Sequence, residues 1–208
     1  MSTMKTLLTT TSVLALAGLA LGLHSPSTTS APSSPPALAT YQIDAGHSAV
    51  VFRCKHLGVS QFWGRFNQIS GELRYDEEDP TTASIQCVIP ADSIDTNSAD
   101  RDRHLKSNDF LSAKEFPELT FTSQSVEATD DGLVIKGELS MHGVTKDVTA
   151  QAEVVGSGET MFNDFRMGFE ARFRVDMRDF GITFVEKNAT AVGPEVDLIV
   201  SLECIRQG

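Results

Sequence analysis

The chain of 208 residues is acidic: it holds 17 Lys and Arg against 28 Asp and Glu, a formal net charge of -11 at pH 7. Residues 1–40 contain one Lys and no acid, so residues 41–208 carry a net charge near -12. This charge argues against nucleic acids and anionic membrane surfaces as general partners. The length of residues 41–208 suits one compact domain.

The first 40 residues do not have the pattern of a folded domain. Residues 1–23 combine an early positive charge, Lys5, with an apolar run over residues 7–23, which is typical of a secretory signal segment. A retained membrane anchor is the alternative, because such a run nearly spans a bilayer. Residues 24–40 predict a flexible linker, since 15 of the 17 are Ser, Thr, Pro or Ala. We therefore expect a periplasmic or secreted protein, tethered to a membrane if the first segment is retained.

Apolar and polar residues alternate through the rest of the chain. Val196, Leu198 and Val200, for example, share one parity, and Asp197 and Ser201 share the other. A period of two predicts strands with one dry and one wet face. Eight strands are expected, over residues 47–56, 64–75, 84–90, 119–127, 133–141, 147–155, 165–177 and 196–205. Short connections favour antiparallel neighbours, and such a sheet closes into a barrel or stacks as a sandwich.

One long segment, residues 92–117, breaks the alternation. Asn97 and Ser98 are good N-cap residues, and residues 99–106 predict two helical turns with acids early and bases late. We expect a helical excursion at about 97–116, long enough to plug or cap one end of a barrel. This is the loop that most suggests a function.

Phenylalanine is abundant, with twelve in the chain. Several lie in or beside the expected strands, namely Phe52, Phe66, Phe121, Phe169, Phe173 and Phe184. Two interpretations stay open. The rings pack into a solid aromatic core, or they line a pocket, because an eight-stranded barrel is just wide enough for one slender ligand.

Several motifs, taken in order, resemble those of a known family. They run from Tyr41-Gln42-Ile43-Asp44 and Gly64-Arg65-Phe66 through His104-Leu105-Lys106-Ser107 and His142-Gly143-Val144-Thr145 to Arg178-Asp179-Phe180-Gly181-Ile182. Their order and spacing across residues 41–208 resemble the YceI-like family. The resemblance implies an eight-stranded, lipocalin-like antiparallel barrel, exported in bacteria, that holds a long apolar molecule of the polyisoprenoid or fatty-amide type. It is also compatible with a homodimer paired through strands.

The expected ligand is thus a long isoprenoid or another lipid, held by an apolar lining below a polar mouth. The expected lining is Val50, Phe52, Phe66, Phe110, Phe116, Phe121, Leu139, Phe169, Phe173 and Phe184. The expected mouth is Arg101, His104 and Lys106, whose side chains suit a phosphate or amide head group. The alternative for the mouth residues is a solvated helix with i,i+3 charge pairs. We expect Asp102 to be structural, either steadying Arg101 or capping backbone N–H groups.

Metal and catalytic chemistry are not expected. The histidines at 47, 56, 104 and 142 are spaced widely and irregularly, with no HExxH motif and no close pair. No Gly-x-Ser-x-Gly turn is present. We therefore expect no enzyme activity, no metal and no cofactor. Two rival functions remain: an envelope structural or interaction domain with a filled core, and a hydrolase or metal-binding protein.

Three cysteines are an odd number for an exported chain. Cys54, Cys87 and Cys204 each share parity with apolar neighbours, which indicates buried thiols that act as small hydrophobic residues. A disulfide between two of them is the alternative.

Overall fold

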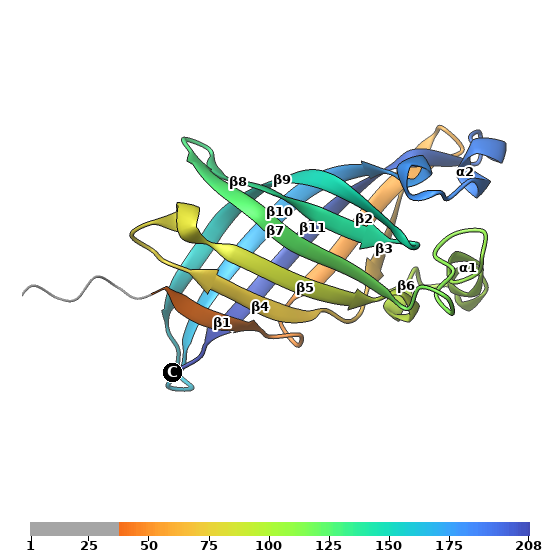
Figure 1. Cartoon of the computed structure of the whole chain (residues 1–208). Helices are drawn as coiled ribbons and strands as arrows, with labels where there is room; N and C mark the ends of the chain where they lie inside the picture. The colour runs from red at the N-terminus through yellow and green to blue at the C-terminus, as the bar shows by residue number, and fades with distance from the viewer. Residues whose placement is uncertain (1–37) are drawn as a thin grey trace, which may run out of the picture. The chain divides into compact units, whose positions relative to one another are not determined.

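A computed structural model describes residues 38–208; residues 1–37, which hold the predicted signal segment and most of the predicted linker, lie outside the described residues. The strands form one antiparallel sheet that closes on itself (Figure 1). They are β1 (Ala39–Ile43), β2 (Ala49–His56), β3 (Ser60–Phe66), β4 (Ser70–Tyr75), β5 (Ser84–Pro90), β6 (Ile94–Asp95), β7 (Glu118–Thr129), β8 (Gly132–Met141), β9 (Val144–Glu159), β10 (Phe165–Asp176) and β11 (Val192–Arg206). The α-helices are α1 (Ala99–Leu105) and α2 (Phe184–Lys187), and 3₁₀ turns lie at η1 (Pro80–Thr82), η2 (Ala91–Ser93) and η3 (Met177–Phe180). No helix within residues 38–208 is long and apolar enough to cross a membrane.

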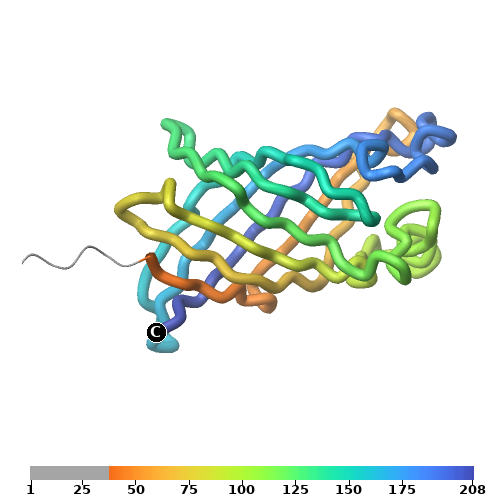
Figure 2. Tube along the Cα trace, viewed as in Figure 1, coloured from red at the N-terminus to blue at the C-terminus, as the bar shows by residue number. Residues whose placement is uncertain are grey.

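The barrel has eight strand positions, because three pairs of short strands, β1 with β2, β3 with β4 and β5 with β6, each act as one bent strand. β1 and β2 lie end to end along β11, where Tyr41 pairs with Arg206 and Val50 pairs with Val200. β4 pairs with β1 and β5, while β3, which continues into β4, pairs with β2 and β6. The sheet is thus an up-and-down meander whose first strand closes against its last (Figure 2). The predicted closed eight-stranded barrel is confirmed, and the sandwich alternative is wrong.

The bends between the paired segments do not show in the alternation of the sequence. Asp44 ends β1, where its side chain accepts a hydrogen bond from the Gly46 N–H at 2.9 Å and forms a local turn. The turn separates β1 from β2, so the predicted strand at 47–56 is only the second half of the barrel strand. β1 begins at Ala39, two residues before the predicted start of the domain.

Alternate residues of the strands point into the barrel and form its core. Tyr41 and Met167 are 2% exposed, and Val50 and Cys204 are fully buried. All three cysteines are free thiols, so the disulfide alternative is not formed. Cys87 and Cys204 are buried, as predicted, whereas Cys54 is only half-buried.

Two glycines let neighbouring groups approach the strands closely. A Cβ on Gly64 would lie 2.3 Å from Cζ of Phe52, so the Phe52 ring lies directly against β3. Gly71 has φ +151°, and a Cβ there would lie 2.1 Å from the carbonyl oxygen of Gln86 on β5. Gly71 is therefore needed for the pairing of β4 with β5.

We predict that Gly71→Ala destabilises the barrel much more than Gly58→Ala. Both glycines have positive φ, but a Cβ on Gly58 meets nothing within 4 Å. The left-handed backbone alone should lower the free energy of unfolding of Gly58→Ala by about 1 kcal/mol. Overpacking should bring the loss for Gly71→Ala to roughly 3 kcal/mol or more. Urea denaturation measures both; equal losses would show that β4 and β5 are not packed this closely.

An ion-pair cluster lies where the first and last strands close the barrel. The Arg166 guanidinium of β10 contacts Asp44 at 2.8 Å, Glu203 of β11 at 2.5 Å and Asp164 at 2.8 Å. His47 Nδ1 also lies 2.9 Å from Asp44 Oδ2. The hydrogen bond with His47 holds the pKa of Asp44 below its ordinary value, with help from the Gly46 N–H and Arg166, and Asp44 in turn raises the pKa of His47.

We predict that His47 stabilises the fold only between two pH limits. Its folded pKa lies above its ordinary 6.5, so its contribution is complete below pH 6.5 and is lost as pH rises through the folded pKa. The folded pKa of Asp44 lies below 3.8, so the pair is lost again as pH falls through that lower value. Urea midpoints of wild type and His47→Gln should therefore differ most between pH 4 and 6.5 and converge at pH 9. A constant difference at all pH values would contradict the pairing.

Candidate functional site

Two segments cover one end of the barrel, which we call the mouth end (Figure 1). The first, residues 97–116, contains α1, so the predicted helical excursion is confirmed. The second, residues 177–191, contains η3 and α2. The sequence analysis missed the second segment, because a helix of four residues has no measurable period. Phe184, which was expected in or beside a strand, lies in this helix.

A buried threonine anchors the start of α1. Asp102 Oδ1 accepts hydrogen bonds from the Thr96 N–H at 2.9 Å and from the Thr96 hydroxyl at 2.5 Å. Asp102 is therefore structural, as expected. Arg101 donates to Thr96 Oγ1 at 2.8 Å and to the Thr96 carbonyl at 2.6 Å, and its guanidinium lies 4.5 Å from the ring centroid of Phe62. Arg101 thus holds the segment against β3.

Three rings join the two covering segments. The ring of His104 lies edge-on to Phe110 at 5.2 Å and to Phe184 at 5.1 Å, and the centroids of Phe110 and Phe184 are 4.8 Å apart. His104 Nε2 also lies 2.9 Å from Asp109 Oδ2, which fixes the imidazole. We call His104, Phe110 and Phe184 the ring cluster. It links α1 to α2, and Phe110 continues inward to the barrel interior.

His142 forms a second link between the covering segments. Its Nε2 lies 3.1 Å from Ser112 Oγ in the first segment, and its Nδ1 lies 2.9 Å from the Phe180 carbonyl oxygen in the second. His142 thus satisfies a backbone carbonyl of the second segment. Among residues 38–208, one group has ligand atoms close enough for a metal, namely Asp44, His47 and Glu203. Both of its carboxylates already accept hydrogen bonds from Arg166.

Three apolar cavities follow one another along the interior from the mouth end. The mouth cavity, about 80 Å³, lies beneath Phe110 and Leu105. The middle cavity, about 80 Å³, is bordered by Cys87 and Ala150, and the far cavity, about 40 Å³, by Tyr75. Four residues border both the mouth and middle cavities, namely Leu119, Met141, Val175 and Leu198. Five border both the middle and far cavities, namely Ile85, Ile135, Ala171, Val200 and Leu202.

Seven of the ten expected lining residues border these cavities. They are Phe52, Phe66 and Phe110 at the mouth cavity, Phe121, Leu139 and Phe173 at the middle cavity, and Phe169 at the far cavity. Val50 is buried in the wall, Phe116 packs on His142, and Phe184 belongs to the ring cluster. The sequence analysis missed Met141 and Ala171, although their parity places both on a dry face.

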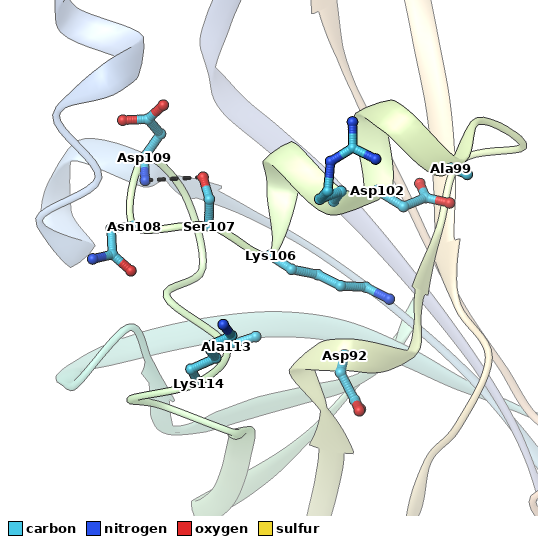
Figure 3. Close-up of a pocket in the computed structure, with 10 residues that line it drawn as sticks. Asp92, Ala99, Asp102, Lys106, Ser107, Asn108, Asp109, Ala113 and Lys114 are labelled. Carbon is cyan, nitrogen blue, oxygen red and sulfur yellow. Dashed lines mark hydrogen bonds between the residues drawn. The ribbon is translucent and has the colours of Figure 1, made fainter.

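A polar cleft of about 950 Å³ lies outside the barrel beside α1 (Figure 3). Its lining carries charges of both signs, including Lys106 and Lys114 on one hand and Asp92 and Asp102 on the other. Figure 3 shows the Lys106 side chain extended into the space between Asp92 and Asp102. Of the three expected mouth residues, His104 is in the ring cluster, Lys106 is in the cleft and Arg101 is on Thr96. Their contact with a head group stays a prediction.

The closed barrel and its dry interior place the chain in the lipocalin-like class of antiparallel β-barrels. The family model of the YceI-like domain matches residues 41–204. The chain belongs to the YceI-like family.

Relatives and solved structures agree with this assignment. The chain is 40% identical over 173 residues to UPF0312 protein YE1254 of Yersinia enterocolitica. This alignment covers 81% of this chain and 87% of that protein. The chain is 41% identical over 174 residues to Protein YceI of Escherichia coli, with coverage of 81% and 88%.

Solved structures share the fold. BcnA of Burkholderia cenocepacia superposes with a TM-score of 0.70 at 22% identity, covering 77% of this chain and 98% of that chain. The YceI protein of Campylobacter jejuni has a TM-score of 0.66 at 25% identity, with coverage of 74% and 90%. A polyisoprenoid binding domain from Saccharophagus degradans has a TM-score of 0.58 at 17% identity, with coverage of 82% and 99%.

We predict that the ring cluster limits access to Cys87. Burial raises the pKa of Cys87 to about 11 and the pKa of Cys204 to about 12, so both native thiols should resist iodoacetamide at pH 8. Phe184→Ala removes the aromatic contacts of Phe184 with Phe110 and His104, each worth about 1 kcal/mol, which should speed alkylation of Cys87 at least about fivefold. Peptide mass spectrometry resolves the labelled cysteines. Phe165→Ala, the same change where β10 packs on Tyr41 of β1, is the control; equal acceleration in both variants would mean general loosening.

Proposed function

We propose that the protein binds one long apolar chain, of isoprenoid or fatty-acyl type, inside the barrel. The observation that carries this proposal is the series of three cavities, which begins under the ring cluster and has an entirely apolar exposed surface. A linear chain fits such a series better than a compact ligand does. Each buried CH₂ group would contribute about 0.8 kcal/mol, so length alone can supply affinity.

Side chains must move for a chain to pass from one cavity to the next. Met141 borders both the mouth and middle cavities, and the flexible methionine side chain adapts readily to a ligand. The ring cluster must also separate, which exposes the mouth cavity while His104 stays near Asp109. In this mechanism His104 and Lys106 lie outside the apolar path, where they contact the polar head group of the ligand, with Arg101 holding α1 in place.

The name of one structural relative supports the class of ligand. The domain from Saccharophagus degradans is described as polyisoprenoid binding, and it shares the barrel fold with this chain. Residues 1–23 further support export, so we place the carrier in the periplasm or outside the cell, where it transports, stores or sequesters its lipid. In this proposal the protein is a carrier, so we assign a catalytic role to no residue.

Ala171→Leu should shorten the chain that the barrel accepts. Ala171 borders both the middle and far cavities, so a larger side chain there closes the passage between them. Affinity for an octaprenyl probe should fall about tenfold or more, because several CH₂ groups lose their site, while farnesyl affinity should fall less than about threefold. Fluorescent prenyl probes measure both. Ala45→Leu, in the exposed turn after β1 and away from the cavities, is the matched control.

Direct extraction tests the function itself. Gentle purification of the exported protein, followed by organic extraction and mass spectrometry, should recover a long-chain lipid in near-stoichiometric amount. No extracted lipid, together with no uptake of prenyl or fatty-acyl probes by the delipidated protein, would reject the proposal and favour the filled-core alternative.

A further inference from the structure

The hairpin of β2 and β3 exposes large apolar side chains. Leu57 is 57% exposed and Val59 is 83% exposed at the turn, and Trp63 on β3 is 47% exposed. These residues are separate from the cavities. We call residues 57–59 the apolar tip.

The backbone conformation at the apolar tip is unfavourable for Leu57. Leu57 has φ 53° and Gly58 has φ 70°, and the Val59 N–H closes the turn on the His56 carbonyl at 3.1 Å. Two successive positive φ values favour Asn-Gly in such a hairpin turn. A leucine here is both strained and exposed to water, so neither folding nor solubility accounts for it. Backbone strain of this kind points to a function of the side chain.

The apolar tip lies at the mouth end. The Leu57 N–H donates to the Ala191 carbonyl at 2.9 Å, which ties the turn to the segment that follows α2. Figure 1 shows the β2–β3 turn beside α2, at the end of the barrel where α1 also lies. A surface that receives the tip would therefore also face the mouth.

The charge around the apolar tip differs from that of the whole protein. Residues 45–71 contain no Asp or Glu, although the chain as a whole carries a net charge of -11. Lys55 and His56 immediately precede the tip and are exposed. Arg53 is paired with Asp197 at 2.8 Å, and its guanidinium lies 5.5 Å from the Trp63 ring. Across the turn, α2 contributes Lys187 and the acidic Glu186. The hairpin is thus a locally basic, apolar projection.

We propose that the apolar tip docks the mouth end onto a phospholipid surface. Leu57 and Val59 enter the acyl boundary, Trp63 lies at head-group level, where tryptophan is enriched, and Lys55 and His56 face lipid phosphates. Docking would place the mouth where a long apolar chain can move between bilayer and barrel. The transfer of a chain between bilayer and barrel rests on the proposed function, but the docking itself does not require a ligand in the barrel.

Binding to vesicles tests the docking. The protein holds a single Trp, Trp63, so its emission reports on the hairpin alone. With vesicles of three parts phosphatidylcholine and one part phosphatidylglycerol, delipidated wild type should co-sediment, and its emission should shift to the blue. Leu57→Asn with Val59→Thr should reduce partitioning at least about tenfold, or about 1.4 kcal/mol. Because Asn suits positive φ, the variant should unfold at the same urea concentration as wild type or higher.

A matched pair of substitutions provides the control. Met161 is 90% exposed at the turn between β9 and β10, and Val155 is 68% exposed on β9. Met161→Asn with Val155→Thr removes similar apolar area elsewhere and should leave vesicle binding unchanged. The docking proposal would be overturned if wild-type protein did not bind vesicles, or if both double variants lost vesicle binding equally. If wild-type protein does not bind vesicles but still binds prenyl probes, the proposed function stands and the docking fails. If it binds vesicles but no prenyl probe, the docking stands and the proposed function fails.

Discussion

Closure of the sheet on β11 is the constraint on which the rest of the structure depends. One edge of β11 pairs with β10, and the other pairs with both β2 and β1, so the last strand holds the first in place. Closure leaves no long free edge at this seam and turns one face of every strand inward. Arg166 strengthens the seam by joining three carboxylates from both sides of it. Without this pairing there is no enclosed interior to hold the proposed ligand.

Glycines help to decide whether the inward phenylalanines fill the barrel or line it. A Cβ on Gly137 would lie 2.7 Å from the ring of Phe121, just as one on Gly64 would collide with the ring of Phe52. Each ring therefore packs closely against the strand that carries the glycine, where any larger residue would collide with it. Small residues, Ala150 and Ala171, also border the middle cavity. This arrangement supports the interpretation in which the phenylalanines line a pocket.

The alternation of the sequence predicted the eight strand positions, because burial on one face imposes a period of two, but it did not predict the bends: β1 and β6 were missed, and the predicted strand at 64–75 joined the end of β3 to β4. The covering segments were harder. α1 has recognisable charges and a long loop around it, whereas α2 is short, and Ile182 reaches the mouth cavity from a loop without periodicity. Sequence also could not separate Phe169, which borders a cavity, from Val50, which is sealed in the wall. That distinction depends on side-chain size across the barrel, which no local pattern records.

The two ends of the barrel carry different structural elements. Residue 39, where β1 begins, and the C-terminus lie at the end opposite the helices (Figure 1). The covering segments and the apolar tip thus lie at the end of the barrel opposite the start of β1. The far cavity is also smaller, about 40 Å³, than the mouth and middle cavities, which are about 80 Å³ each. The proposed ligand entry, docking and head-group contact would thus all lie at one end, which is the arrangement that a carrier exchanging its ligand with a bilayer requires.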